Sequence, residues 1–136
     1  FIFLFSLSLS LFWLMCLHFQ APEVVNYEPL TCATDMWNIG VLIYVLVSGH
    51  TPFGGATKLD TQSNITHCIL DFPTDLFEKI SENCIDLIQK LIVRVSKQRM
   101  TAHQSLEHPW ICSNHDQQVN EQIEHLAEQI HEQNFD

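Results

Sequence analysis

Basic side chains are scarce in this sequence. Its 136 residues include six Lys and Arg residues against sixteen Asp and Glu residues, which gives a formal net charge of −10. A chain of this charge is repelled by phosphate backbones and by anionic lipid headgroups. We therefore expect neither nucleic acid nor an anionic membrane surface as a partner. The length allows one domain at most.

Patterns typical of metal sites and of phosphate-binding loops are also missing. The four glycines form no G-x-G-x-x-G run, the five cysteines contain no C-x-x-C pair, and the eight histidines lack ligand spacing. Cysteines that are odd in number and widely spaced indicate free thiols in a reducing compartment rather than a disulfide framework. The sequence therefore predicts no zinc site and no phosphate-binding loop.

Formal charge is absent from residues 1–19, which are mostly Phe, Leu, Ile and Ser. Such a stretch is close in length and hydropathy to a membrane-spanning or signal segment. However, it has no initiating Met, no basic flank and no small-x-small cleavage site before Ala21. Codons for Phe, Leu and Ser are rich in pyrimidines, and Phe19-Gln20 can be encoded by TTTCAG, as at the 3′ end of an intron. We interpret residues 1–20 as translated intron, with a signal or membrane segment as the alternative.

Three short motifs follow in order. Ala21-Pro22-Glu23 comes first, and Asp35-Met36-Trp37-Asn38-Ile39-Gly40 begins twelve residues after Glu23. The third motif, Arg99-Met100-Thr101-Ala102, leads into Leu106-Glu107-His108-Pro109-Trp110. An A-P-E tripeptide closes the activation segment of protein kinases, and the other two motifs are typical of later parts of that domain. The three in this order are a specific signal, whereas A-P-E alone would be a weak one.

Over about residues 21–111 the sequence resembles the Ser/Thr protein kinases of the calmodulin-dependent-kinase-like group. It is most similar to the death-associated protein kinases and their apoptosis-inducing relatives, through residues 21–29 and 33–42. The resemblance implies an all-α fold that corresponds to the lower part of the kinase C-lobe, without the N-lobe or the catalytic loop. It divides the chain into a hydrophobic segment (1–20), a partial C-lobe (21–111) and an acidic tail (112–136).

The resemblance implies ATP- and magnesium-dependent phosphoryl transfer to protein Ser and Thr in the full-length protein. This chemistry needs a Gly-rich loop, a strand lysine, an H-R-D loop and a D-F-G metal ligand, all of which precede A-P-E in the family. Residues 1–20 fit none of these, and Asp71-Phe72-Pro73 follows A-P-E and has proline in place of glycine. We therefore expect no catalytic, cofactor-binding or metal-binding residue in this chain, and no activity from it alone.

Two alternatives remain open for the function. The chain could be a truncated isoform that competes, without catalysis, for docking partners. It could also be a single-pass membrane protein, because of residues 1–20. The kinase resemblance instead implies an intracellular location.

The patterns after Ala21 predict helices joined by loops. A short helix should begin at Pro22, and a central helix should run from Asp35 to about Val47 behind Thr34 as its N-cap. The central helix is apolar on every side, so it should be buried all round. Its most buried side chains should include Trp37, Ile39, Leu42 and Ile43.

Three further helices are predicted. A polar helix from Thr57 to Ile69 should have Leu59, Ile65 and Cys68 on its inner side, and the resemblance makes it a docking surface for protein substrates or regulators. Ser81 and Thr101 are expected to cap the other two helices.

Three charged residues stand out by their resemblance to the family. Glu23 and Arg99 resemble the pair that ties the activation segment to the lower lobe, which implies a partly buried, bidentate ion pair. In the family, Asp35 accepts hydrogen bonds from the H-R-D loop, so here it must find other donors, reach water or take up a proton. Val95-Ser96 replaces the D-P of the family, which loosens the loop before Arg99.

The tail is acidic and rich in glutamine. Its apolar residues Val119, Ile123, Leu126 and Ile130 are spaced as one stripe of a helix. Such a helix could pack on the lobe or on a partner, or it could remain solvated. Calmodulin targets are basic amphipathic helices, and no Lys or Arg follows Arg99, so we expect no calmodulin binding.

Overall fold

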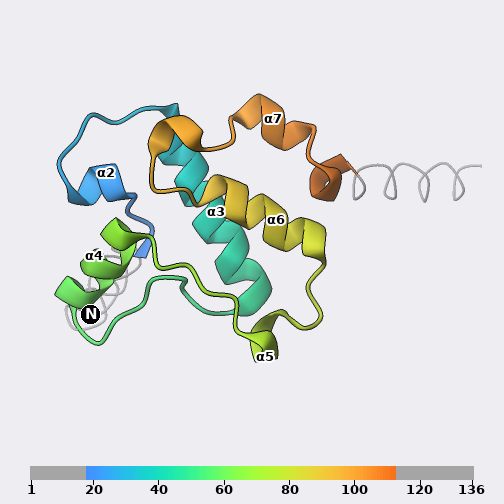
Figure 1. Ribbon diagram of the computed structural model, residues 1–136, viewed down its shortest axis with the longest axis horizontal. Coiled ribbons are helices and arrows are strands. Elements are labelled where there is room, and N and C mark those ends of the chain that lie inside the picture. Colours follow the sequence, from blue (N-terminus) through green and yellow to red (C-terminus); the bar gives the residue numbers. More distant parts are fainter. Residues whose placement is uncertain (1–17, 113–136) are drawn as a thin grey trace, which may run out of the picture. The chain divides into compact units, whose positions relative to one another are not determined.

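The computed structural model describes residues 18–112, and it divides into two compact units, Phe1–Thr101 and Ala102–Asp136 (Figure 1). The first unit contains α2 (Pro22–Val25), α3 (Cys32–Ser48), α4 (Lys58–His67), α5 (Thr74–Phe77), α6 (Glu82–Leu91) and the 3-10 helix η1 (Ser96–Gln98). The second unit contains α7 (Ala102–Leu106), and helical backbone resumes at Pro109. Residues 18–112 contain no strand, which confirms the all-α prediction.

The predictions for residues 1–17 and for the apolar stripe from Val119 to Ile130 concern residues outside the described part of the chain. Within residues 18–112, no helix is both long and apolar enough to cross a bilayer.

The central helix, α3, begins three residues earlier than predicted, and its N-cap is Thr31 rather than Thr34. Thr31 has an extended backbone, and its hydroxyl accepts a hydrogen bond from the Ala33 N–H at 3.3 Å. Thr34 already lies in the first turn, where its hydroxyl accepts from the Thr31 N–H at 3.2 Å. Both threonines thus satisfy N–H groups that a helix start would otherwise leave without partners. At the other end, Gly49 adopts a left-handed conformation (φ 73°) and terminates the helix.

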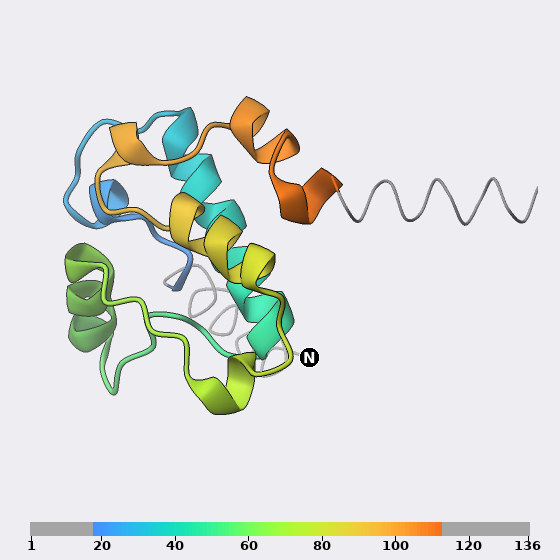
Figure 2. The ribbon, with the colours of Figure 1, turned by 45° about the vertical axis from the view of Figure 1, so that its right-hand side comes forward.

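The main core lies between α3 and α6, which run alongside each other in both views (Figures 1 and 2). The buried side chains of this core come from both helices and include Trp37, Val41, Leu87, Ile88 and Leu91. As predicted, Ser81 caps α6, since its hydroxyl accepts from the Cys84 N–H at 3.3 Å.

Gly40 lies directly against the end of α6 and the residue that follows it. A Cβ atom at this position would lie 2.7 Å from Ile92 Cγ1 and 2.8 Å from Leu91 Cβ. Both distances are shorter than a carbon–carbon contact can be, so any side chain here would push α3 and α6 apart.

We expect Gly40→Ala to destabilise the chain by about 1–3 kcal/mol, the cost typical of overpacking a core. Helix propensity acts in the opposite direction, because alanine is favoured over glycine by about 1 kcal/mol in a helix interior. The sign of the change therefore tests the packing directly. Urea unfolding of the variant and of the unmodified chain measures it, and a more stable variant would show that the two helices do not make this contact.

One face of α3 is exposed, and the predicted burial of its residues is wrong. Trp37 is buried as expected, but Ile39 and Leu42 are 42% and 46% exposed, Leu46 is more exposed still, and Ile43 is half-buried. The elements that pack on α3 are α5, α6 and η1, and they leave this face uncovered among the described residues.

Two elements differ from the prediction in the region between α3 and α6. Helix α4 ends at His67 rather than at Ile69, and Cys68 follows it in a left-handed conformation (φ 53°). Leu59 is exposed rather than inward, and the inner face consists of Thr61 and Ile65. Helix α5 was not predicted. It forms directly after Pro73, and its Phe77 packs on the ring of Tyr44 at 5.0 Å between centroids.

Candidate functional site

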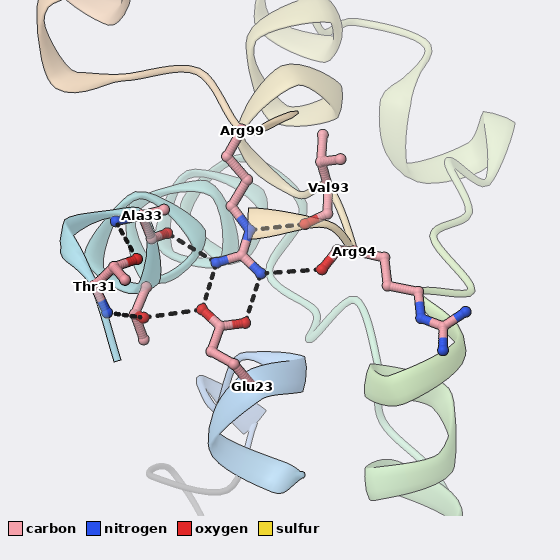
Figure 3. A network of polar contacts seen from close by, with 7 residues as sticks. Glu23, Thr31, Ala33, Val93, Arg94 and Arg99 are labelled. Atoms are coloured by element: carbon pink, nitrogen blue, oxygen red, sulfur yellow. Dashed lines mark hydrogen bonds and ion pairs between the residues drawn. The ribbon is translucent and has the colours of Figure 1, made fainter. Parts of the chain in front are cut away.

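The site is an ion pair between Glu23 in α2 and Arg99, which follows η1 (Figure 3). Arg99 Nη1 lies 2.6 Å from Glu23 Oε1, and Arg99 Nη2 lies 2.7 Å from Glu23 Oε2. The side chains are 0% exposed for Arg99 and 6% for Glu23. This confirms the predicted bidentate contact between residues 76 positions apart, but the pair is almost fully buried rather than partly buried.

The remaining donors of the Arg99 guanidinium are satisfied by backbone carbonyl groups (Figure 3). Arg99 Nε donates to Val93 O at 2.7 Å, Nη1 donates to Ala33 O at 2.9 Å, and Nη2 donates to Arg94 O at 3.4 Å. With the two bonds to Glu23, all five N–H donors of the guanidinium have acceptors. A buried charge is tolerated when it is paired and fully hydrogen-bonded, and both conditions are met here.

The indole ring of Trp37 lies against the same guanidinium. Arg99 Cζ is 5.0 Å from the centroid of the Trp37 ring, a distance at which a cation is attracted to an aromatic face. Trp37 also stacks on Phe53, with ring centroids 5.2 Å apart and planes 10° apart. Arg99 is therefore linked to the carboxylate of α2 and to the aromatic core next to α3.

The charged form of Glu23 is favoured by its partners. Burial alone would raise the pKa of this carboxyl. Hydrogen bonds from Arg99, from the Glu23 backbone and from Thr34 lower it, as does the positive charge of Arg99, and the net pKa lies below the usual 4.5. The pair is therefore ionised at neutral pH.

The other residues of the A-P-E and D-x-W-x-x-G motifs have different environments. Ala21 and Pro22 are buried at the start of α2, and Gly40 is buried against α6. Asp35 is exposed, so its carboxylate is open to solvent.

The last motif is divided between the units: Arg99, Met100 and Thr101 end the first unit, and the second unit begins with helix α7 directly after Thr101, as predicted. His108 is buried, Pro109 is exposed and Trp110 is half-buried. The Trp110 N–H donates to His108 Nδ1 at 3.3 Å.

Sequence reasoning did not identify two residues that contribute to the site. Thr34 donates a hydrogen bond to Glu23 Oε1 at 2.9 Å, although the sequence suggested only a capping role. Phe53 stacks on Trp37, and nothing in the sequence beyond its aromatic type signals this contact. The spacing of Thr31 and Thr34 does signal a capping box, but not the contact of Thr34 with Glu23.

Within residues 18–112, no group of three or more His, Cys, Asp and Glu side chains is placed to hold a metal ion.

A sequence model of the protein kinase domain matches residues 13–111. This chain belongs to the protein kinase family. The match begins eight residues before Ala21, inside the segment that the sequence analysis set apart, and it ends at the same residue as the predicted C-lobe.

Curated kinases place the chain beside the death-associated group. It is 48% identical to human death-associated protein kinase 2 over 101 residues, which cover 74% of this chain and 27% of that protein. It is 50% identical to the mouse protein of the same name over 93 residues, which cover 68% of this chain and 25% of that protein. The chain thus spans about a quarter of the length of the curated kinases it matches.

Solved kinase structures share the fold. The twitchin kinase region from C. elegans superimposes with a TM-score of 0.68 at 45% identity, over 69% of this chain and 17% of that one. The autoinhibited serine kinase domain of titin gives a TM-score of 0.69 at 39% identity, over 70% of this chain and 30% of that one. The chain is therefore a fragment of a kinase domain related to the death-associated Ser/Thr kinases, and its helices match the kinase C-lobe.

Proposed function

We propose that this chain is the lower part of the C-lobe of a Ser/Thr kinase, and that its contribution to phosphoryl transfer is structural. In the full-length protein, the Glu23–Arg99 pair would fix the A-P-E end of the activation segment against the helical lobe. ATP, Mg²⁺ and the catalytic groups would be held by residues that precede A-P-E in the family. The structural motif residues are Ala21, Pro22, Glu23, Asp35, Trp37, Gly40, Arg99, His108, Pro109 and Trp110.

The observation that supports this proposal is that every N–H donor of the Arg99 guanidinium has a hydrogen-bond acceptor. The buried guanidinium donates all five of its N–H groups to Glu23 and to three carbonyl groups. Removing the two charges from water costs free energy, and the network offsets this cost only when all of its partners are present. It joins α2, the first turn of α3 and the segment before Arg99. Such a junction positions the activation segment without contacting substrate or nucleotide.

Docking of protein substrates or regulators is assigned to the outer face of α4. Leu59 and Ile69 are 77% and 60% exposed at the start of this helix and just beyond its end, so they are available to a partner.

The location proposed for the full-length protein is intracellular, and residues 1–20 are proposed to be translated intron.

The activity prediction concerns two proteins. The chain of residues 1–136 should show no ATP-dependent phosphorylation of peptides and no magnesium-dependent nucleotide binding, because it lacks the four catalytic motifs. A protein extended upstream of Ala21 by the exons of the same gene should bind ATP and phosphorylate Ser and Thr. Radiolabel transfer to a peptide library and calorimetric titration with MgATP measure both.

The control is the extended protein in which asparagine replaces the aspartate of the H-R-D loop. Any phosphate transfer in this control measures the activity of contaminating kinases. Turnover by the short chain above this background would contradict the proposal. An extended protein that folds but transfers no phosphate would be a pseudokinase, which would overturn the proposed activity.

A further inference from the structure

We propose that Thr34 is a positioning residue that orients the Glu23 carboxylate toward Arg99 and couples the ion pair to the capped first turn of α3. The inference concerns this chain itself and does not rest on catalytic activity. It goes beyond the two residues of the ion pair, because it assigns their geometry to a third side chain.

The Thr34 hydroxyl is placed to act in both directions. Its side chain is buried, and Oγ1 lies 2.9 Å from Glu23 Oε1. An ionised carboxylate can only accept hydrogen bonds, so the hydroxyl donates to Glu23. The lone pairs of Oγ1 remain free to accept, and the Thr31 N–H donates to them at 3.2 Å.

The first turn of α3 contacts both members of the ion pair. Thr34 donates to Glu23 Oε1, the oxygen that also accepts from Arg99 Nη1 at 2.6 Å. The residue before it, Ala33, accepts from the same Nη1 at 2.9 Å through its carbonyl group. Three hydrogen bonds and the peptide bond between Ala33 and Thr34 therefore close a ring through Glu23 and Arg99.

This ring makes the two oxygens of Glu23 inequivalent. Oε1 receives donors from Arg99 and Thr34, whereas Oε2 receives Arg99 Nη2. A partial rotation of the carboxylate about its Cγ–Cδ bond would break the Thr34 contact, so the threonine helps to fix the plane of the carboxylate. Side chains held by such neighbours lose less freedom when the ion pair forms.

A simpler role for Thr34 is to cap α3 alone. Thr31 allows the two roles to be separated, because it shares the capping function while its hydroxyl bonds to Ala33 rather than to Glu23. Its hydroxyl accepts from the Ala33 N–H, and its side chain is exposed. Loss of the Thr31 hydroxyl should weaken the helix start without changing the environment of Glu23.

Among the described residues, one charged group contacts Glu23, and the charged groups on the neighbouring elements are exposed. Arg99 is the charged group that contacts it, and Arg94 contributes its carbonyl group to the same guanidinium. Asp35 of α3, Glu28 beyond α2, and Lys58, Asp60 and His67 of α4, which packs on α2, are all exposed. A change in the pKa of Glu23 on substitution of Thr34 therefore reports the lost hydroxyl.

The test compares Thr34→Val, Thr34→Ser and Thr31→Val in the chain of residues 1–136. Valine has nearly the shape of threonine without the hydroxyl, and serine keeps the hydroxyl. The pKa of Glu23 is measured by NMR titration of its side-chain carboxyl carbon, and the equilibrium constant for unfolding is measured in urea.

Thr34→Val should raise the pKa of Glu23 and increase the unfolding constant on the order of tenfold, as expected for loss of a hydrogen bond to a charged group. Thr34→Ser should restore both values. Thr31→Val should raise the unfolding constant by about fivefold, as expected for loss of a cap, and leave the pKa of Glu23 unchanged.

The free energy of unfolding, followed as the pH is lowered, gives a second measurement. A carboxyl with a lowered pKa in the folded state contributes stability above its unfolded pKa, and this contribution is lost as the pH falls through the folded pKa. Because Thr34→Val raises the folded pKa toward 4.5, the stability that Glu23 contributes should be smaller than in the unmodified chain, and its loss should be complete at a higher pH.

If Thr34→Val does not fold, the unmodified chain still decides the question. The NMR signal of the Thr34 β-carbon should titrate with the same midpoint as the Glu23 carboxyl. A Thr34 signal that is insensitive to this titration, or a Glu23 pKa that moves equally in Thr31→Val and Thr34→Val, would overturn the proposal.

Discussion

Replacing Arg99 by methionine should destabilise the chain by about 3–5 kcal/mol, the cost typical of removing one partner from a buried ion pair. The substitution leaves the Glu23 carboxylate, whose residue is 5% exposed, without its counter-charge. It also removes the donors of three carbonyl groups, those of Ala33, Val93 and Arg94. Methionine retains much of the aliphatic bulk, so lost packing contributes little. Urea unfolding followed by circular dichroism measures the change.

The matched control is Lys90→Met, which removes an ion pair of another kind. Lys90 and Asp86 lie one helical turn apart on α6, and their side chains are 49% and 46% exposed. Exposed pairs of this spacing contribute about 0.3–0.5 kcal/mol. If the Arg99 variant loses no more stability than the Lys90 variant, the buried pair does not hold the fold together.

Replacing Trp37 by alanine should also cost about 3–5 kcal/mol, the range for truncating a large buried aromatic side chain. Trp37 is 0% exposed, stacks on Phe53, and packs on the guanidinium of Arg99. Its loss would leave a cavity next to a buried charge, and α3 cannot close the gap without moving away from Arg99. Thermal and urea unfolding measure the effect.

Two further variants serve as comparisons for Trp37→Ala. Leu46→Ala removes a large side chain of the same helix that is 73% exposed, and it should change the stability little. Trp37→Phe keeps an aromatic ring for stacking and should cost less than the alanine variant. It sacrifices no hydrogen bond, because Trp37 Nε1 has no partner among the residues that the structure describes. A Trp37→Ala variant as stable as Leu46→Ala would contradict the packing around Arg99.

Much of this architecture could be predicted because the motifs are specific. The contact of Glu23 with Arg99 came from family resemblance, since no local pattern links residues 76 positions apart. The cap at Ser81 came from residue chemistry, because an N-cap hydroxyl has a clear local cause.

The exposed face of α3 could not be predicted from its own sequence. A helix that is apolar on every side has no asymmetry from which a buried face can be chosen. Ile39 and Leu42 were therefore assigned to the core with Trp37, and the positions of α5, α6 and η1 decide the matter instead.

The finer detail of the site depended on groups that give no sequence signal. Backbone carbonyls such as Val93 O and Arg94 O occur at every position, so their use by Arg99 is visible only in the folded chain. Thr31 and Thr34 can both cap a helix, and which one does so depends on backbone geometry. Helix α5 was missed because four residues are too few for periodicity to show.

The central claim is that the Glu23–Arg99 pair joins α2 to the rest of the first unit, and a double-mutant cycle tests it most directly. Unfolding free energies are compared for the unmodified chain, Glu23→Gln, Arg99→Met and the double variant. We expect the double variant to be more stable than the sum of the single effects predicts, with a coupling energy of about 2–3 kcal/mol. A coupling energy below about 0.5 kcal/mol, the value of an exposed pair, would contradict the claim.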